Sequence, residues 1–331
     1  MTRRRVATVG LVLLGLVACG ALALLAPLRP VRSISAPQPA AGYDAARARL
    51  EALGNDDTCS VAPECRTIVL AHGARVRHVV VLFHGLTNCP AQFDSLGRLL
   101  YARGANVVIP VLPRHGCADR RTTALADLTS PELRVFTERI LDAAASLGDS
   151  LTVAGLSVGG VLVAWAAQER PDVTRAVAIA PMFGLALAPG SLSNAVARVY
   201  RATPNRFQWW DPRVREKLPG PTHVYPRWST RAIGEVLWLG ASVENAARQR
   251  APACRSIALV LVPGDLAIDD RRAAAVAEAW RAHGASVETF VFPESLRLNH
   301  DIVDPEQVGA NPRVVYPRLL DLILPGPPRA S

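Results

Sequence analysis

The chain has 331 residues, of which 50% are hydrophobic and 20% are charged, and it carries a formal net charge of +9. This composition is that of an ordinary globular protein, and the length suits one α/β domain that carries an inserted lid. Nearly all of the positive charge is arginine, because Lys217 is the only lysine, and the arginines are scattered along the chain. This distribution argues against a nucleic-acid footprint, and we expect no nucleic-acid partner.

The N-terminus combines a short basic stretch with a long apolar one. Arg3, Arg4 and Arg5 precede residues 6–28, which contain no charged side chain. The apolar run is long enough to cross a bilayer as a helix and longer than the apolar region of a typical signal peptide. The positive-inside rule places the arginines in the cytoplasm and the rest of the chain outside. Residues 1–32 are therefore predicted to be a membrane anchor or signal segment.

Three interpretations of this segment remain open. It forms an uncleaved membrane anchor, or a lipoprotein signal in which residues 16–19 are the lipobox, or a secretory peptide cleaved near residues 21–23. Each of them places the rest of the chain in the cell envelope outside the cytoplasm, either attached to the membrane or secreted. Residues 33–66 begin with a stretch rich in proline, alanine and serine, and we interpret them as a linker and N-terminal extension.

Segments of strand length alternate with segments of helix length through most of the remaining chain. Residues 79–83 form a continuous apolar run rich in valine, which is typical of a strand buried on both faces. The alternation predicts the α/β class with a mostly parallel, doubly wound sheet. In chain order we expect helix 44–53, strands 67–72 and 77–83, helix 91–103, strand 106–110, helix 131–147, strand 151–154, helix 160–169, strands 177–180 and 257–262, helix 271–283, strand 287–292 and helix 312–324.

One long stretch, residues 182–253, interrupts this alternation. It contains four of the six tryptophans, at positions 209, 210, 228 and 238, and several prolines. We predict an inserted lid, which divides the core into a first part, 67–181, and a second part, 254–331. Two interpretations of the tryptophans remain open: they form an apolar cover over a substrate pocket, or they are the small core of the lid itself.

The sequence at 155–159 reads Gly-Leu-Ser-Val-Gly and matches the pattern G-x-S-x-G. A short apolar strand leads directly into it and a helix leads directly out, which is the context of a nucleophile elbow. The sharp turn leaves room only for small residues beside the serine, and Gly155 and Gly159 provide that room. This context predicts Ser157 as a nucleophile exposed at the end of the sheet.

A serine hydroxyl needs a general base and an acid that orients the base. His300 lies in a loop after the last predicted strand, where the chain order Ser…Asp…His places the base. Asp265 follows the end of the preceding strand and is our candidate for the acid. Asp269 and Asp270 are rivals, although Asp269 is better placed to cap the helix that begins near residue 271.

An oxyanion that develops on the substrate needs hydrogen-bond donors. One is expected to be the backbone N–H of Val158, the residue after the nucleophile. The other is expected from the loop after strand 77–83, where the backbone N–H of Leu86 is the natural candidate. The side chain of His84 is expected to brace this loop.

The cysteines agree with export to an oxidising compartment. Cys59 and Cys65 lie close together in a polar loop, and Cys89 and Cys117 lie in two loops that this fold makes neighbours. We therefore predict the disulfides Cys59–Cys65 and Cys89–Cys117, with Cys254 left over. The spacings do not match a zinc knuckle or ribbon, so no metal site is expected.

The run 84–93, His-Gly-Leu-Thr-Asn-Cys-Pro-Ala-Gln-Phe, resembles the oxyanion segment of bacterial α/β-hydrolases akin to carboxylesterases and monoacylglycerol lipases. Residues 113–116, Pro-Arg-His-Gly, are similar to the P-x-H-G loop of the same group. The resemblance covers about residues 67–324 and implies the α/β-hydrolase fold, a Ser–Asp–His triad and a helical lid after the sixth strand. It also implies hydrolysis of carboxylic esters without metal or cofactor. Pro263 departs from the group, which more usually has glycine or threonine there.

The predicted function is that of an exported or membrane-anchored serine ester hydrolase, carboxylesterase-like or lipase-like, acting on a small-molecule ester or an acyl lipid. The same triad serves acyltransferases, thioesterases and peptidases, and these alternatives remain open together with a non-catalytic binding module. A haloalkane dehalogenase is disfavoured, because that chemistry needs a carboxylate where Ser157 stands. The length of the acyl chain does not follow from the sequence.

Overall fold

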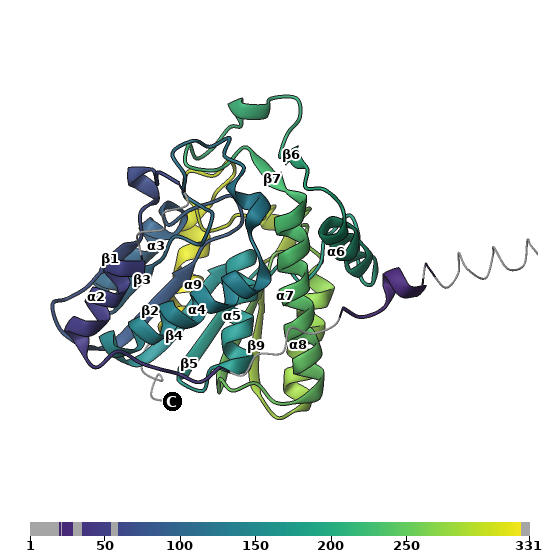
Figure 1. The fold of residues 1–331 in the computed structure, drawn as a ribbon. Helices are drawn as coiled ribbons and strands as arrows, with labels where there is room; N and C mark the ends of the chain where they lie inside the picture. Colours follow the sequence, from purple (N-terminus) through teal and green to yellow (C-terminus); the bar gives the residue numbers. More distant parts are fainter. Residues whose placement is uncertain (1–19, 21, 29–34, 54–58, 326–331) are drawn as a thin grey trace, which may run out of the picture.

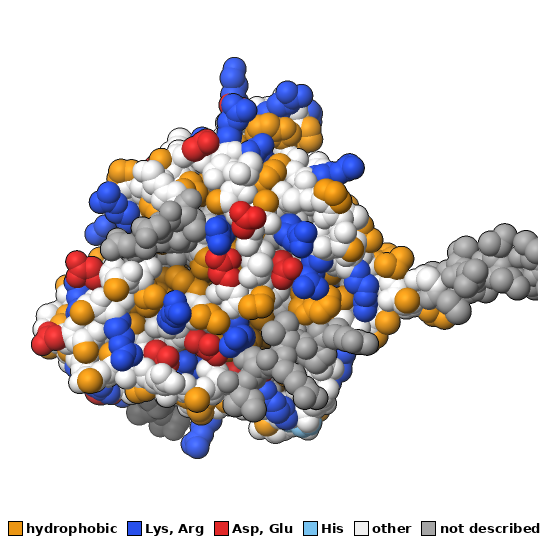
Figure 2. Space-filling model, in the orientation of Figure 1, with side chains coloured by type: hydrophobic (Ala, Val, Ile, Leu, Met, Phe, Trp, Pro, Cys, Tyr) orange, Lys and Arg blue, Asp and Glu red, His pale blue; other side chains and the backbone are white. Residues whose placement is uncertain are grey.

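The computed structural model describes residues 20, 22–28, 35–53 and 59–325 (Figure 1). The basic stretch and the lipobox predicted within residues 1–19 lie outside the described residues. Among the helices that are described, none has both the length and the apolar character needed to cross a bilayer. Figure 2 shows the basic side chains spread over the visible face and interspersed with acidic ones, which agrees with the scattered arginines of the sequence.

A seven-stranded sheet forms the centre of the molecule, in the order β1-β3-β2-β4-β5-β8-β9. The edge strand β1 runs antiparallel to β3, and all other neighbouring strands in this sheet are parallel. This topology confirms the predicted α/β class with a mostly parallel sheet. The strands are β1 (Ile68–Leu70), β2 (Val76–Phe83), β3 (Asn106–Ile109), β4 (Gly148–Leu156), β5 (Val173–Ile179), β8 (Ser256–Leu261) and β9 (Ser286–Val291).

Helices cover both faces of the sheet (Figure 1). Two of them, α3 and α9, pack together on one face, and α4, α5, α7 and α8 follow one another across the other. The central strands are buried because both faces are covered, and their apolar side chains form one continuous core. The helices are α2 (Tyr43–Leu53), α3 (Ala91–Ala102), α4 (Ser130–Ala144), α5 (Val158–Glu169), α6 (Leu192–Ala202), α7 (Thr230–Gln249), α8 (Asp270–Ala282) and α9 (Pro312–Ile323).

Between β5 and β8 the chain leaves the sheet and forms α6, the hairpin of β6 (Phe207–Trp209) and β7 (Arg227–Ser229), and α7. The resemblance implied a lid after the sixth strand. Here the insertion follows β5, because only one antiparallel edge strand precedes the parallel strands of the described sheet.

Three tryptophans of this insertion have partners on its own elements. The Arg201 guanidinium lies 3.7 Å from the Trp238 ring, and the rings of Trp210 and Trp228 are 6.2 Å apart. Trp228 also approaches Tyr200, with 6.4 Å between the ring centroids. Trp228 and Trp238 also pack against the main hydrophobic core, and Trp210 is 43% exposed, so these tryptophans join the insertion to the domain and do not form a separate core.

The predicted disulfide pairing is wrong, although the same four cysteines are involved: the structure pairs Cys59 with Cys117 and Cys65 with Cys89. The reason lies in the path of the backbone, because residues 60–62 run antiparallel to 116–118 and bring Cys59 beside Cys117. A 3-10 turn over Pro63–Cys65 then turns the chain toward Cys89. Cys254 is free, as expected, and the structure places it in a buried position.

Peptide mapping under non-reducing conditions tests this pairing. Cleavage after Glu64 separates Cys59 from Cys65, which otherwise share one tryptic peptide. Combined digestion should yield one linked pair of peptides containing Cys59 and Cys117, and another containing Cys65 and Cys89. A peptide pair that links Cys59 directly to Cys65 would contradict the structure.

Candidate active site

Ser157 lies in the turn between β4 and α5, at the carboxyl end of the sheet. Its backbone has φ 59° and ψ −111°, a sparsely populated conformation for a residue with a side chain. Hydrogen bonds hold the turn, since the Ser157 N–H donates to the Ile179 carbonyl at 2.9 Å and the Ser157 carbonyl accepts from the N–H groups of Val161 and Met182. The side chain is almost buried, with 6% of the residue exposed.

The two elbow glycines are required by close backbone contacts. A Cβ atom on Gly159 would lie 2.0 Å from the carbonyl oxygen of Phe83, the last residue of β2. A Cβ atom on Gly155 would lie 2.6 Å from the carbonyl group of Gly159. Neither contact is compatible with any side chain, so the start of α5 packs directly against the end of β2.

His300 and Asp265 form a hydrogen-bonded pair. The Nδ1–H of His300 donates to Asp265 Oδ2 at 2.5 Å, and Asp265 Oδ1 accepts from the Ala267 N–H at 2.7 Å. The side chain of Asp265 is 1% exposed and that of His300 is 25% exposed. Burial lowers the pKa of His300, but the hydrogen bond to Asp265 and its charge raise that pKa more, with a net rise.

Asp269 and Asp270, the two rivals of Asp265, interact with groups other than His300. Asp269 caps α8, as expected, and accepts hydrogen bonds from the backbone N–H groups of Arg271 and Gly190. Asp270 lies close to Asp265, and burial, together with the charge of Asp265, raises the pKa of Asp270 to about 6. Of the three carboxylates, Asp265 is the one that accepts the His300 hydrogen bond.

The loop after β2 borders Ser157. A Cβ atom on Gly85 would lie 3.7 Å from the Ser157 Cβ atom, so the backbone leading to Leu86 runs alongside the nucleophile. His84 braces this loop: its Nδ1–H donates to the Gly85 carbonyl at 2.9 Å, and its Nε2 accepts from the Leu112 N–H at 3.0 Å. Burial lowers the pKa of His84 well below the ordinary value, and His84 therefore acts as a neutral structural side chain.

The predicted site residues therefore come from the carboxyl ends of different strands. Ser157 and Val158 follow β4, Leu86 follows β2, Asp265 follows β8 and His300 follows β9. In an open α/β sheet, this edge is where ligands bind.

The sequence analysis missed three polar residues that connect these loops: Asn88, Gln92 and Asp301. All three are buried, and Asp301 accepts hydrogen bonds from the side-chain amides of the other two. A signal was available, since Gln92 is a polar residue on the buried side of helix α3 and Asp301 directly follows the candidate base. The periodicity of helix α3 shows that Gln92 is buried, but it does not show that Gln92 faces the loop of Asp301.

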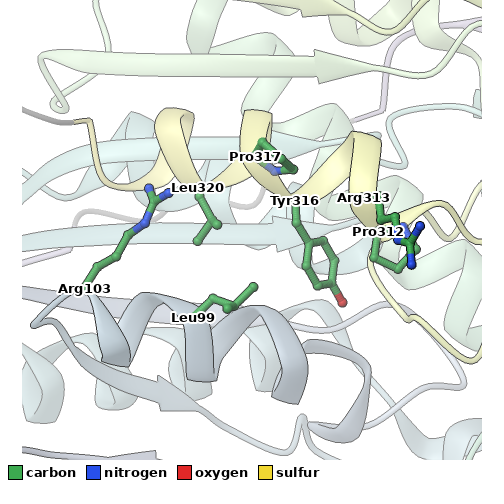
Figure 3. A pocket seen from close by; sticks show the side chains of 7 residues that line it. All are labelled: Leu99, Arg103, Pro312, Arg313, Tyr316, Pro317 and Leu320. Carbon is green, nitrogen blue, oxygen red and sulfur yellow. The ribbon is translucent and has the colours of Figure 1, made fainter.

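A surface groove of about 340 Å³ lies between α3 and α9 (Figure 3). None of Ser157, Asp265 and His300 lines it, and it therefore has no part in the candidate site. Its lining residues are Leu99, Arg103, Pro312, Arg313, Tyr316, Pro317 and Leu320.

Comparison with known proteins agrees with this arrangement. The model of the Hydrolase_4 family, described as serine aminopeptidase, S33, matches residues 74–253. A pyrethroid hydrolase of Sphingobium wenxiniae is 31% identical over 93 residues, which are 28% of this chain and 31% of that protein. The match thus spans about a third of the length of this curated relative.

Solved structures with the same fold include lipolytic enzymes. Monoglyceride lipase of Saccharomyces cerevisiae has a TM-score of 0.60 at 14% identity, over 78% of this chain and 91% of that one. Monoacylglycerol lipase of Paleococcus ferrophilus has a TM-score of 0.57 at 19% identity, over 78% and 97% of the two chains. A structure of the metagenome-derived lipolytic enzymes LipS and LipT has a TM-score of 0.57 at 19% identity, over 80% and 99%. At these identities the likeness establishes the fold.

Because the elbow packs so closely against β2, adding one methyl group at position 159 should strongly destabilise the fold. We expect Gly159→Ala to prevent folding or to lower the free energy of unfolding by more than about 3 kcal/mol, beyond the usual cost of overpacking. Gly85→Ala is the matched control, because its new Cβ atom would have no neighbour closer than 3.7 Å. Denaturant titrations of both variants measure the difference, and equal stabilities would contradict the structure.

The His300–Asp265 pair predicts a pH dependence. A general base must be neutral, so kcat/KM should rise with pH through a His300 pKa that lies above the ordinary histidine value. In Asp265→Asn the two contributions of Asp265, which raise this pKa most, are lost, so the acidic limb of the pH profile should move to lower pH while kcat falls by about 10²–10⁴-fold. Asp269→Asn is the control: asparagine can also cap a helix, and this variant should leave the acidic limb of the kcat/KM profile at the same pH. An unmoved limb in Asp265→Asn would exclude Asp265 as the partner of the base.

Proposed function

The chain belongs to the Hydrolase_4 (serine aminopeptidase, S33) family of α/β-hydrolases, and from this premise we propose that it hydrolyses carboxylic esters through the triad Ser157–His300–Asp265. The observation that carries the proposal is the 2.5 Å hydrogen bond from His300 to Asp265, formed at the same edge of the sheet as the strained elbow of Ser157. Metal and cofactor have no role in this proposal.

In the proposed reaction, the Ser157 hydroxyl attacks the ester carbonyl carbon while Nε2 of His300 accepts the hydroxyl proton. Asp265 stabilises the imidazolium that forms and holds Nδ1 protonated. The backbone N–H groups of Leu86 and Val158 bind the oxyanion. His300 then gives its proton to the leaving alcohol, and the acyl group stays on Ser157. A water molecule, deprotonated by His300, attacks the acyl-enzyme; the bond to the Ser157 oxygen then breaks, His300 returns the proton to that oxygen, and the carboxylic acid is released.

An apolar rim beside the site supports an acyl or otherwise apolar substrate. Leu187 and Leu266 are 95% and 87% exposed, more than the other large apolar side chains of the described residues. Leu185 pairs with Ile268 in an antiparallel bridge, and the Ala186 N–H donates to the Ala267 carbonyl, so the segments that carry Leu187 and Leu266 lie side by side. Leu266 directly follows Asp265 and therefore lies next to the candidate acid. Exposed apolar groups of this kind typically mark a surface that receives an apolar ligand.

We also propose that the enzyme works outside the cytoplasm, held at the membrane by its N-terminal segment or released from it. The two disulfides support an oxidising compartment. Arg198 on α6 donates hydrogen bonds to the carbonyls of Leu24, Ala26 and Pro27, and so ties the end of the apolar N-terminal run to the insertion (Figure 1). In this arrangement residues 24–27 lie against α6 of the insertion.

Hydrolysis of a chain-length series of p-nitrophenyl esters by the full chain tests the proposal. We expect measurable hydrolysis in the wild type and a loss of about 10⁴-fold or more in kcat for Ser157→Ala, with the fold unchanged by circular dichroism. A fluorophosphonate probe should label the wild type and not the variant. An alanine variant that retained the activity would exclude Ser157 as the nucleophile.

Two companion assays separate the alternatives that use the same triad. Cleavage of aminoacyl p-nitroanilides in place of esters would identify an aminopeptidase. Labelling by fluorophosphonate without ester hydrolysis, together with transfer of an acyl group to an added alcohol, would identify an acyltransferase. Both outcomes would replace the ester-hydrolase proposal.

A further inference from the structure

A buried amide–carboxylate contact links the loop after β2 to the loop of the proposed base. Nε2 of Gln92 donates to Oδ2 of Asp301 at 2.6 Å, across a sequence separation of 209 residues. The two residues are only 2% and 8% exposed. Neither belongs to the proposed triad or supplies an oxyanion N–H.

Each end of this contact continues to the backbone of one catalytic loop. Oε1 of Gln92 accepts the Gly85 N–H at 2.8 Å, one residue before Leu86. Asp301 is the residue directly after His300. Its Oδ1 accepts hydrogen bonds from the N–H groups of Val303 and Asp304, both at 3.1 Å. One amide and one carboxylate thus connect the residue before the proposed oxyanion donor to the residue after the proposed base.

We propose that Gln92 and Asp301 are positioning residues, whose hydrogen bond fixes the Leu86 N–H and the His300 imidazole relative to each other. The inference rests on the proposed function, since it assigns a task only if Leu86 and His300 act in the reaction. Asn88 adds a second, weaker support, because its amide donates to the same Asp301 oxygen at 3.3 Å.

The Gln92–Asp301 hydrogen bond should matter more for the positions of the catalytic groups than for the stability of the fold. A hydrogen bond between buried groups adds little net stability compared with its strength in isolation, since both groups were hydrogen-bonded to water in the unfolded chain. Loss of one partner leaves the other buried and unpaired. A displacement of about 1 Å at a reacting group, by contrast, can reduce the rate roughly 10²-fold.

The charge of Asp301 acts in addition to its hydrogen bonds. Together with Asp265 and Asp270, it contributes to the raised pKa of His300. Other ionisable groups nearby are Asp304 and His223, whose Oδ2 and Nε2 atoms are 3.0 Å apart, and Tyr316 on α9, whose hydroxyl donates to the Val303 carbonyl at 2.8 Å. Removal of the Asp301 charge should therefore lower the pKa of His300, whereas a neutral change at Gln92 should leave this pKa nearly unchanged.

Exchange of the two functional groups tests the proposal in the full-length enzyme. In Asp301→Asn, the amide N–H of the new asparagine faces the amide N–H of Gln92, so two donors meet. In Gln92→Glu, the carboxylate of the new glutamate faces the carboxylate of Asp301, so two acceptors meet. The double variant restores an amide facing a carboxylate, because Glu at 92 still accepts the Gly85 N–H and now also accepts from Asn at 301. We expect each single variant to lose about 10–100-fold in kcat with a smaller change in KM, and the double variant to recover most of the loss.

Gln168 provides the matched control, since it is a buried glutamine whose amide also bonds on both sides, to Trp280 and Ala251. It lies near the far end of α5, about 16 Å along the helix from Ser157. Gln168→Glu should lower the melting temperature without a matching loss of kcat. The acidic limb of kcat/KM should move to lower pH in Asp301→Asn and not in the control.

Two outcomes would overturn the proposal: single variants with wild-type kcat, or a double variant no better than the worse single one. These results differ from failure of the proposed function itself, in which the wild type would neither hydrolyse esters nor react with a fluorophosphonate at Ser157. A wild type that is active and labelled, with variants that lose only melting temperature, would refute the positioning role and leave the triad intact.

Discussion

The candidate site depends on one close approach, that of the Gly159 backbone to the carbonyl oxygen of Phe83. With only 2.0 Å between that oxygen and the position of a Cβ atom, the start of α5 lies directly on the end of β2. The nucleophile elbow and the loop that leads to Leu86 are thereby parts of one packed unit. Backbone contacts thus set the position of the Ser157 backbone relative to the loop of the proposed oxyanion donor.

Buried polar side chains help to hold the loops of the proposed acid and base, and the loop of the acid also forms backbone hydrogen bonds with residues 184–186. Asp265 is fixed by the Ala267 N–H and in turn fixes His300, while Asp301 connects the base loop to Gln92. Such contacts add little net stability, because each replaces hydrogen bonds to water. Their directionality specifies one loop conformation, which apolar packing of the same volume does not.

The fold followed from the sequence because local patterns determine it. The apolar run at 79–83 and the elbow at 155–159 each carry their structural meaning within a few residues, and β2 and the β4–α5 turn lie where they were expected. The disulfide partners of Cys59 and Cys65 did not follow, since pairing depends on how residues 60–62 run beside a distant loop. The contact between Gln92 and Asp301 was missed for the same reason.

The insertion between β5 and β8 is bonded to the loop that carries the proposed oxyanion donor. The indole N–H of Trp210 donates to the Thr87 hydroxyl at 3.0 Å, and the Tyr225 N–H donates to the Thr87 carbonyl at 2.8 Å. Thr87 has φ 66°, a left-handed conformation that is unfavourable for a β-branched residue and persists only when neighbours fix it. Any movement of the insertion must break these bonds or carry Thr87 along with it. The conformation of Thr87, the residue after Leu86, is therefore coupled to the position of the insertion. The same two hydrogen bonds to Thr87 thus affect both the placement of the insertion over the site and the geometry of the proposed oxyanion donor.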